Sequence, residues 1–118
     1  MWVTMPNLIE GLEVIKSWGF TYKTCGFNWV KTYKSGKPVI GLGYWTRANA
    51  ELCLIATKGK IRRISKNVSQ IIMETPREHS RKPDIVRDKI VELVGDLPRI
   101  ELFARQYADG WDCWGNEV

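Results

Sequence analysis

Arg105, Asn116 and Glu117 are the residues of this 118-residue chain whose types and spacing best suit ligand binding. Arg105 follows a segment with the apolar residues Ile100, Leu102 and Phe103, which we predict to be a buried strand that delivers the guanidinium to its carboxyl edge. Asn116 and Glu117 follow Gly115, so they offer an amide and a carboxylate with little bulk beside them. In open α/β sheets the ligand crevice lies beyond the carboxyl ends of strands, where such side chains can hydrogen-bond a ribose. The C-terminal segment is therefore predicted to bind a hydroxyl-rich ligand.

Hydrophobic periodicity predicts an alternating α/β order for the elements that must position these residues. The expected elements are strands at residues 2–4, 20–32, 50–57, about 68–74 and from 100, and helices at residues 7–18 and 83–94. Gly19 and Gly95 are natural C-terminal stops for the two helices, and Pro83 suits a first helical turn. Residues 34–47 contain glycine and proline, and residues 75–82 are polar, so both segments are predicted to be loops.

Length and composition predict one soluble domain covering residues 1–118, with 44% hydrophobic residues to build a core. No stretch approaches the roughly 18 apolar residues of a membrane span, and no secretory leader is recognised, so we expect a cytoplasmic protein. Cys25, Cys53 and Cys113 are odd in number and lack C-x-x-C spacing, which argues against a disulfide framework or a zinc site. Cys25 and Cys53 fall in apolar strands and are expected to be buried thiols.

The formal charge of +5 favours approach to a polyanion. One basic cluster, within residues 58–63, consists of Lys58, Lys60, Arg62 and Arg63. Two interpretations of this cluster stay open, a surface that contacts nucleic-acid phosphates and an ordinary solvated face. A second group of basic residues, which includes Lys82, lies at residues 77–87.

Five short motifs occur in an order that resembles the MT-A70 family of adenine-N6 methyltransferases. The C-terminal pattern is similar to the family ending "ELF-(G/A)-R…W…GN-(E/Q)". The other four matches are Trp2-Val3-Thr4, Trp29-Val30-Lys31-Thr32, Ala50-Glu51-Leu52-Cys53-Leu54 continuing to Lys58-Gly59, and Ser80-Arg81-Lys82-Pro83-Asp84. The resemblance covers essentially the whole chain and implies an α/β, Rossmann-like S-adenosylmethionine-dependent methyltransferase fold.

One family segment has no counterpart in these 118 residues. The resemblance implies an Asp-Pro-Pro-Trp segment upstream of the Trp-Val-Thr strand, where it binds the amino group of the target adenine, and none of the five Asp residues here precedes two prolines. We therefore expect a domain that is incomplete at its N-terminus. In the family sheet the strand leading into that segment lies between residues 2–4 and residues 100–103, so a central gap is expected there.

The resemblance also implies roles for residues that bind the cofactor, S-adenosylmethionine. Lys82 would neutralise the methionine carboxylate, Arg105 would orient the cofactor tail or a nearby loop, and Asn116 and Glu117 would bind the ribose hydroxyls. On the acceptor side, Trp2 would line the adenine pocket or else serve the core. Glu51 would face the acceptor or else be a surface charge.

The leading interpretation is an adenine-N6 methyltransferase of DNA or RNA, or its C-terminal portion, with no catalytic residue of its own and no activity alone. The alternative is a non-catalytic pseudo-methyltransferase module that binds nucleic acid or a partner chain, and a third is an inert remnant. No metal is expected. We expect a homodimer, or a partner chain that completes the sheet, with the loop at residues 34–47 as a second contact surface implied by the family.

Overall fold

Two long antiparallel strands, β2 (Thr21–Lys31) and β3 (Ala50–Thr57), form the centre of the protein. The computed structural model describes residues 1–118. β2 is rich in β-branched and aromatic residues, which suit a pleated, half-buried surface, whereas β3 consists mainly of aliphatic residues. The register shifts between Cys25 and Phe27, where Gly26 lies so close to Ile55 that a Cβ would be 2.5 Å from that side chain. Glycine therefore lets β2 keep its pairing with β3 at this bulge.

Two short strands complete a mixed four-stranded sheet in the order β1-β3-β2-β4. β1 (Trp2–Val3) pairs antiparallel with β3, and β4 (Ile71–Glu74) pairs parallel with β2. The last two strands, β5 (Ile100–Leu102) and β6 (Asp112–Trp114), form a separate parallel pair. β1 and β5 thus belong to different sheets, and each hydrogen-bonds to a strand on one side only.

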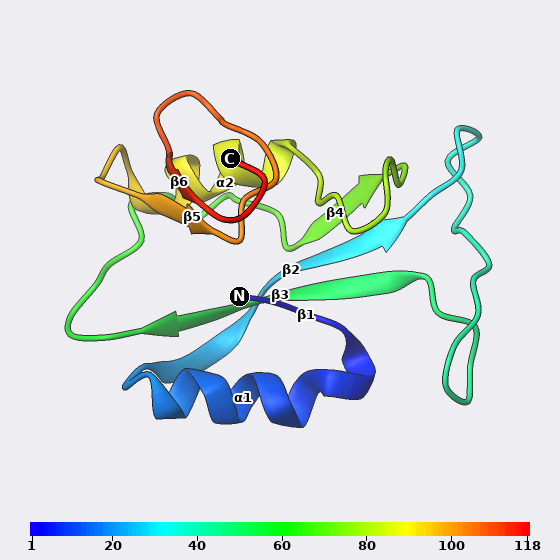
Figure 1. The fold of residues 1–118 in the computed structure, drawn as a ribbon, viewed down its shortest axis with the longest axis horizontal. Helices are drawn as coiled ribbons and strands as arrows, with labels where there is room; N and C mark the ends of the chain where they lie inside the picture. The colour runs from blue at the N-terminus through cyan, green and yellow to red at the C-terminus, as the bar shows by residue number, and fades with distance from the viewer.

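The helices lie on opposite sides of the four-stranded sheet (Figure 1). A 3-10 turn, η1 (Met5–Asn7), leads into α1 (Leu8–Ser17), which covers one face and buries Ile15. The other side carries α2 (Ile85–Val94) together with β5 and β6.

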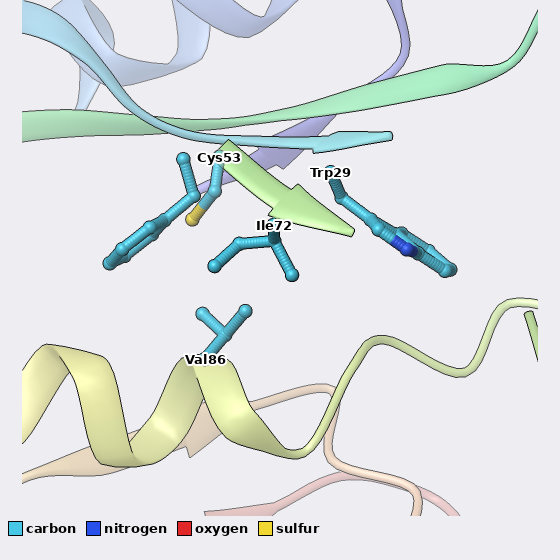
Figure 2. Packing of buried hydrophobic residues seen from close by; sticks show 5 residues of the cluster. Trp29, Cys53, Ile72 and Val86 are labelled. Carbon is cyan, nitrogen blue, oxygen red and sulfur yellow. The ribbon is translucent and has the colours of Figure 1, made fainter. Parts of the chain in front are cut away.

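The main apolar core lies between the sheet and α2. Phe27, Trp29, Cys53, Ile72 and Val86 form this cluster, and Figure 2 shows Val86 of α2 directed toward the sheet side chains. Phe27 and Trp29 are two positions apart, so both point to the same face of β2. The core is small, since only 11 of the 118 residues are buried. The radius of gyration of 14.8 Å also exceeds the roughly 13.5 Å of a compact domain of this length.

Most of the predicted elements are confirmed. The helix expected at residues 7–18 is α1, the strand expected at residues 50–57 is β3, and the helix expected at residues 83–94 is α2, which Gly95 caps. The loops at residues 34–47 and 75–82 are also present, and the buried thiol expected at Cys53 is found, whereas Cys25 is only partly buried.

The prediction that residues 100–103 form a buried strand is wrong. Ile100, Leu102 and Phe103 are 54%, 47% and 72% exposed. The physical reason is that Ile100 and Leu102 share one face of β5, and that face lines the open cleft and does not pack against another element. Phe103 has a positive φ of 59° and lies beyond the strand, where its ring packs edge-on against Trp114 with a 5.2 Å separation of ring centres. β1 and β5 do not pair with each other, as the gap expected between residues 2–4 and 100–103 requires, and the missing strand between them stays a prediction.

Candidate functional site

Glu51 is the central residue of a charged and aromatic cluster at one end of the four-stranded sheet. It lies opposite Trp29 in the pairing of β2 and β3. Because side chains alternate along a strand, Lys31 returns to the face of Trp29 two positions later. Lys31 Nζ lies 3.9 Å from Glu51 Oε1, and Lys82 Nζ donates a 3.1 Å hydrogen bond to Glu51 Oε2. The Glu51 carboxylate, with 14% of its side chain exposed, therefore contacts two ammonium groups.

Two tryptophan rings flank these ammonium groups. Trp2 and Trp29 pack edge to face with ring centres 6.2 Å apart. Lys82 Nζ lies 5.7 Å from the centre of the Trp2 ring, and Lys31 Nζ lies 5.1 Å from that of Trp29, both within range of a cation–π attraction. Trp29 Nε1 donates a 2.9 Å hydrogen bond to the Glu74 carbonyl. The rings and the cations therefore fix one another in position.

The loop of residues 75–82 is held to α2 by ion pairs around Asp84. Arg77 Nη1 and Arg81 Nη2 each lie 3.0 Å from Asp84 Oδ2, and Arg87 Nη1 lies 3.3 Å from Oδ1. Partial burial alone would raise the pKa of Asp84, but the charges of Arg77 and Arg81 outweigh it and lower the pKa below its usual value. The carboxylate is therefore ionised at neutral pH, and it fixes the loop that delivers Lys82.

A small polar cavity of about 240 Å³ opens beside this cluster. Its lining consists of Trp29, Lys31, Glu51 and residues 76–82. The cavity thus presents the carboxylates of Glu51 and Glu78, several cations and the Trp29 ring, which can hydrogen-bond and stack on a polar planar group.

A larger cleft of about 820 Å³ lies between β1 and β5, and it is lined by both apolar and charged side chains. Trp2 and Cys53 line it from the sheet, Val86 from α2, and residues 100–103 from β5 and beyond. Its polar lining residues include Lys82, Arg105 and Glu117. Lys82 lines both the cavity and the cleft, so the two spaces meet at its side chain.

The C-terminal residues predicted to bind a ligand are only partly brought together. Arg105 Nε lies 2.9 Å from Glu117 Oε2, and the Arg105 guanidinium also donates to the His79 carbonyl. The chain can approach Arg105 closely enough for the ion pair with Glu117 because residue 115 is glycine, since a Cβ there would lie 2.7 Å from the carbonyl oxygen of Ala104. Asn116 is exposed and is not part of the cleft lining.

The predicted basic cluster is exposed and lies at the other end of β3. Lys58, Lys60, Arg62 and Arg63 form no ion pair, and Lys58 Nζ lies 5.8 Å from the centre of the Phe20 ring. Seven residues of strand, at about 3.3 Å each, separate Lys58 from Glu51 by roughly 23 Å. The cluster therefore cannot share a small ligand with Glu51.

Comparison with known proteins decides which family this arrangement represents. The MT-A70 family model matches residues 1–117. The chain belongs to the MT-A70 family. This family uses S-adenosylmethionine and acts on nucleic acids, and membership implies the methyltransferase fold for the mixed α/β structure described above.

Three relatives illustrate how the match is distributed. The Type II methyltransferase M.MunI from a Mycoplasma species is 39% identical over 120 residues, which cover 100% of this chain and 49% of the relative. The N6-methyladenosine RNA methyltransferase MTA1 from Cryphonectria parasitica is 32% identical over 108 residues, or 92% of this chain and 30% of the relative. An N(6)-adenosine-methyltransferase MT-A70-like protein from Arabidopsis thaliana is 29% identical over 123 residues, covering 100% of this chain and 18% of the relative. The chain thus spans about half the length of these relatives or less.

The donor set along the cleft fits the cofactor that the MT-A70 family uses. Lys82 offers a cation for a carboxylate, and Glu117 offers oxygen acceptors for hydroxyl groups. The cleft volume of about 820 Å³ falls within the range of roughly 300–1,000 Å³ that small-molecule sites occupy. The exposed amide of Asn116 lies next to Glu117 in sequence but outside this lining.

Sequence reasoning missed two parts of the site. The strand motif that contains Lys31 assigns it no role, although its spacing of two positions from Trp29 places both side chains on the same face. The ion pairs around Asp84 involve Arg77, Arg81 and Arg87. From the sequence alone, these residues are only part of the second group of basic residues, at positions 77–87. No helix is long and apolar enough to cross a membrane, and no group of three His, Cys, Asp or Glu side chains is arranged to hold a metal ion.

Proposed function

We propose that this chain holds the cofactor and one wall of the acceptor pocket in an S-adenosylmethionine-dependent adenine-N6 methyltransferase of nucleic acid. The observation that carries the proposal is the position of Lys82, which lines the larger cleft and also hydrogen-bonds Glu51 beside the smaller cavity. A residue at this junction can link a cofactor in the cleft with an adenine in the cavity. The family and its cofactor are consistent with this assignment.

On the cofactor side, Lys82 neutralises the methionine carboxylate. Its ammonium group has three N–H donors, and the bond to Glu51 uses one of them, so two remain for a ligand. Lys31 also contacts Glu51, which leaves part of the Lys82 charge uncompensated. Arg105 orients the adjoining segment, and Asn116 and Glu117 receive the ribose hydroxyls.

On the acceptor side, Glu51 accepts a hydrogen bond from the adenine amino group, and Trp2 contributes an aromatic wall. The bound cofactor supplies a methyl group on a positively charged sulfur. The adenine amine is a weak nucleophile because its lone pair is delocalised into the ring, so holding it in line matters more than any proton transfer. Glu51 retains unused lone pairs in addition to those that face Lys31 and Lys82.

Calorimetric titration with S-adenosylhomocysteine tests the cofactor assignment. We expect weak binding by the 118-residue chain and at least a further tenfold loss in Lys82→Ala, because each charge-assisted hydrogen bond contributes about 1.5–3 kcal/mol. Asn116→Ala should weaken binding as well. Lys16→Ala, which removes an exposed charge from α1, is the matched control and should bind like the parent chain. A micromolar complex that survives both Lys82→Ala and Asn116→Ala would show that the site lies elsewhere.

The second candidate function is a non-catalytic module that binds nucleic acid or a partner chain. The specific observation in its favour is the exposed cluster of Lys58, Lys60, Arg62 and Arg63, which has no ion pair and lies far from Glu51. Nucleic-acid binding that is unaffected by Lys82→Ala, together with no cofactor binding at all, would favour this candidate.

We also propose that a strand from a second copy or from another polypeptide pairs with the free edges of β1 and β5 at the apolar part of the cleft, and leaves the polar part around Lys82, Arg105 and Glu117 to the cofactor. Both strands have an unpaired edge, and such edges expose backbone donors and acceptors that pair readily with another strand. The exposed side chains of Ile100 and Leu102 line the same cleft and favour an apolar occupant.

A further inference from the structure

The segment between β2 and β3, residues 32–49, carries features that the proposed site does not use. Its base is firmly attached to the sheet. Lys31 accepts a 2.8 Å backbone hydrogen bond from Val39 and donates one of 2.8 Å to Asn49, and Thr32 bridges Pro38 in antiparallel fashion. Figure 1 shows the rest of the segment extending away from the body of the protein at the end of β2. The segment is therefore an anchored arm, which we call the β2–β3 arm.

The tip of the β2–β3 arm exposes two aromatic rings and an aliphatic side chain. Leu42, Tyr44 and Trp45 are 90%, 79% and 92% exposed. Tyr44 and Trp45 meet edge to face with ring centres 6.2 Å apart. Trp45 has a φ of 76°, a conformation that residues with a large side chain rarely adopt. Exposed aromatic groups held in this way indicate a contact surface rather than part of the core.

The charge of the β2–β3 arm identifies the kind of partner. Residues 32–49 contain Lys34, Lys37 and Arg47 and no acidic residue. None of these three cations takes part in an ion pair, so their full charge faces solvent. Aromatic faces interleaved with unpaired cations bind single-stranded nucleic acid, where the bases stack and the phosphates release counterions.

The position of the β2–β3 arm connects this partner with the candidate site. Lys31, which anchors the base of the arm through its backbone, also contacts Glu51 through its side chain. A strand of nucleic acid bound along the arm would reach the sheet beside the cavity of Trp29, Lys31 and Glu51. The basic cluster of residues 58–63 lies at the other end of β3 and contains no aromatic residue, and the neighbouring Phe20 ring is only 40% exposed and lies beneath Lys58 Nζ.

We propose that the β2–β3 arm binds single-stranded nucleic acid, with Tyr44 and Trp45 stacking on unpaired bases and Lys34, Lys37 and Arg47 contacting phosphates. The proposal rests on the proposed function in that it names the surface that guides the substrate to the acceptor cavity. An unpaired strand is the expected form, because stacking on a protein ring requires a base that is free of its own stack.

Fluorescence anisotropy with labelled single-stranded oligonucleotides, both DNA and RNA, tests the role of the rings. The double variant Tyr44→Ala/Trp45→Ala should lose at least about tenfold in affinity, which corresponds to one stacked base. Its dependence on salt should stay unchanged, because no cation is removed. Tyr107→Ala is the matched control, since that ring is 76% exposed outside the arm and should make no difference.

The triple variant Lys34→Ala/Lys37→Ala/Arg47→Ala tests the role of the charges. The slope of log affinity against log salt should fall by about 2 for a single strand, from the release of roughly 0.7 counterions per lost contact. Circular dichroism should show that both arm variants keep the parent fold, since every substituted side chain is at the surface.

Two outcomes would overturn the inference. The double variant could bind single strands as tightly as the parent chain, or it could bind normally while losing self-association in light scattering, which would assign the arm to protein pairing. These outcomes are separate from failure of the proposed function, which is measured by S-adenosylhomocysteine binding. If the parent chain binds no cofactor but both arm variants lose affinity for nucleic acid, the arm proposal stands and the proposed methyltransferase role is wrong.

Discussion

Lys82 donates a hydrogen bond of 3.1 Å to Glu51, although the two residues are 31 positions apart in the sequence. The bond joins the loop before α2 to the first residues of β3. Lys82 also lies over the Trp2 ring, with 5.7 Å from Nζ to the ring centre. The Lys82 ammonium group therefore connects the loop of residues 75–82 with Glu51 of β3 and with the ring of Trp2.

A double-mutant cycle should show that Glu51 and Lys82 stabilise each other. We expect Glu51→Gln and Lys82→Met to be coupled by about 1 kcal/mol in the free energy of unfolding, because the pair is partly shielded from solvent. Urea unfolding of the two single variants and the double variant measures this coupling. Glu13→Gln with Lys16→Met on the exposed face of α1 is the control cycle, and its coupling should be near zero. Additive effects at Glu51 and Lys82 would contradict a direct interaction.

The 118-residue chain alone should transfer little or no methyl group to nucleic acid. The reason is that these residues contain no Asp-Pro-Pro-Trp segment to bind the adenine amino group. Incubation with labelled S-adenosylmethionine and either DNA or RNA measures the transfer, with a nucleic acid that lacks adenine as the control. Robust incorporation that requires adenine would contradict this expectation and assign the missing hydrogen bonds to Glu51 or its neighbours.

The basic cluster should bind nucleic acid in a way that depends on salt but hardly on sequence. Replacing Lys58, Lys60, Arg62 and Arg63 with Ala should lower the salt slope for a duplex by between about 3 and 4, since each neutralised phosphate contributes about 0.9. Filter binding over a range of salt concentrations measures the slope, and the double variant Lys16→Ala/Lys23→Ala, compared per charge removed, controls for the loss of charge outside the cluster. If the parent chain retains neither duplex nor single strand at low salt, the cluster is only a solvated face.

Asp84 should make stability depend on pH in the acidic range. Its pKa is lower in the folded protein than in the unfolded chain, so its stabilising contribution is complete above the unfolded value of about 3.9. That contribution is lost as the pH falls through the folded pKa. The difference in unfolding free energy between the parent chain and Asp84→Asn should therefore shrink steadily below about pH 4. Urea unfolding from pH 7 to pH 2 measures it, and a difference that stays constant would show that Asp84 is not ionically coupled to Arg77 and Arg81.

The order and type of the main elements could be predicted because local signals agree with the final packing. β3 matches its predicted bounds because it lies inside the sheet and its consecutive residues Cys53 and Leu54, which point to opposite faces, are both buried. α2 begins two residues after Pro83 and ends before Gly95, as the proline and glycine signals indicate. The prediction of burial failed at Ile100 and Leu102. An apolar pattern indicates that a strand can be buried, but it does not show whether another element packs against that strand.

The candidate site was only partly predictable for a similar reason. Lys82, Glu51 and Trp2 were selected by their resemblance to family motifs, and the structure brings these three side chains together. Lys31 and Asp84 contribute through contacts between separate elements, and single-sequence patterns carry no record of such contacts. The role of Asn116 rests on sequence alone, since its exposed side chain does not line the cleft.

The unpaired edges of β1 and β5 should cause the chain to self-associate. Ile100 and Leu102 are each about half exposed beside the cleft, so completing their burial should stabilise an assembly by about 1 kcal/mol per side chain. An identical chain is always available at the same concentration, and it presents the same unpaired edges. Light scattering at low micromolar concentration should therefore give a mass above that of one chain.

A charge placed at the edge of β5 should abolish this self-association. Leu102→Lys puts an ammonium group where another strand would pack, which is how natural edge strands avoid pairing. Ile9→Lys is the matched control, because it adds the same charge at a site on α1 that is 70% exposed. The first variant should scatter as a monomer and the second as the parent chain. A parent chain that is itself a stable, well-folded monomer would contradict the prediction, and it would mean that the side chains of Trp2, Val86 and Leu102 tolerate the open cleft in water.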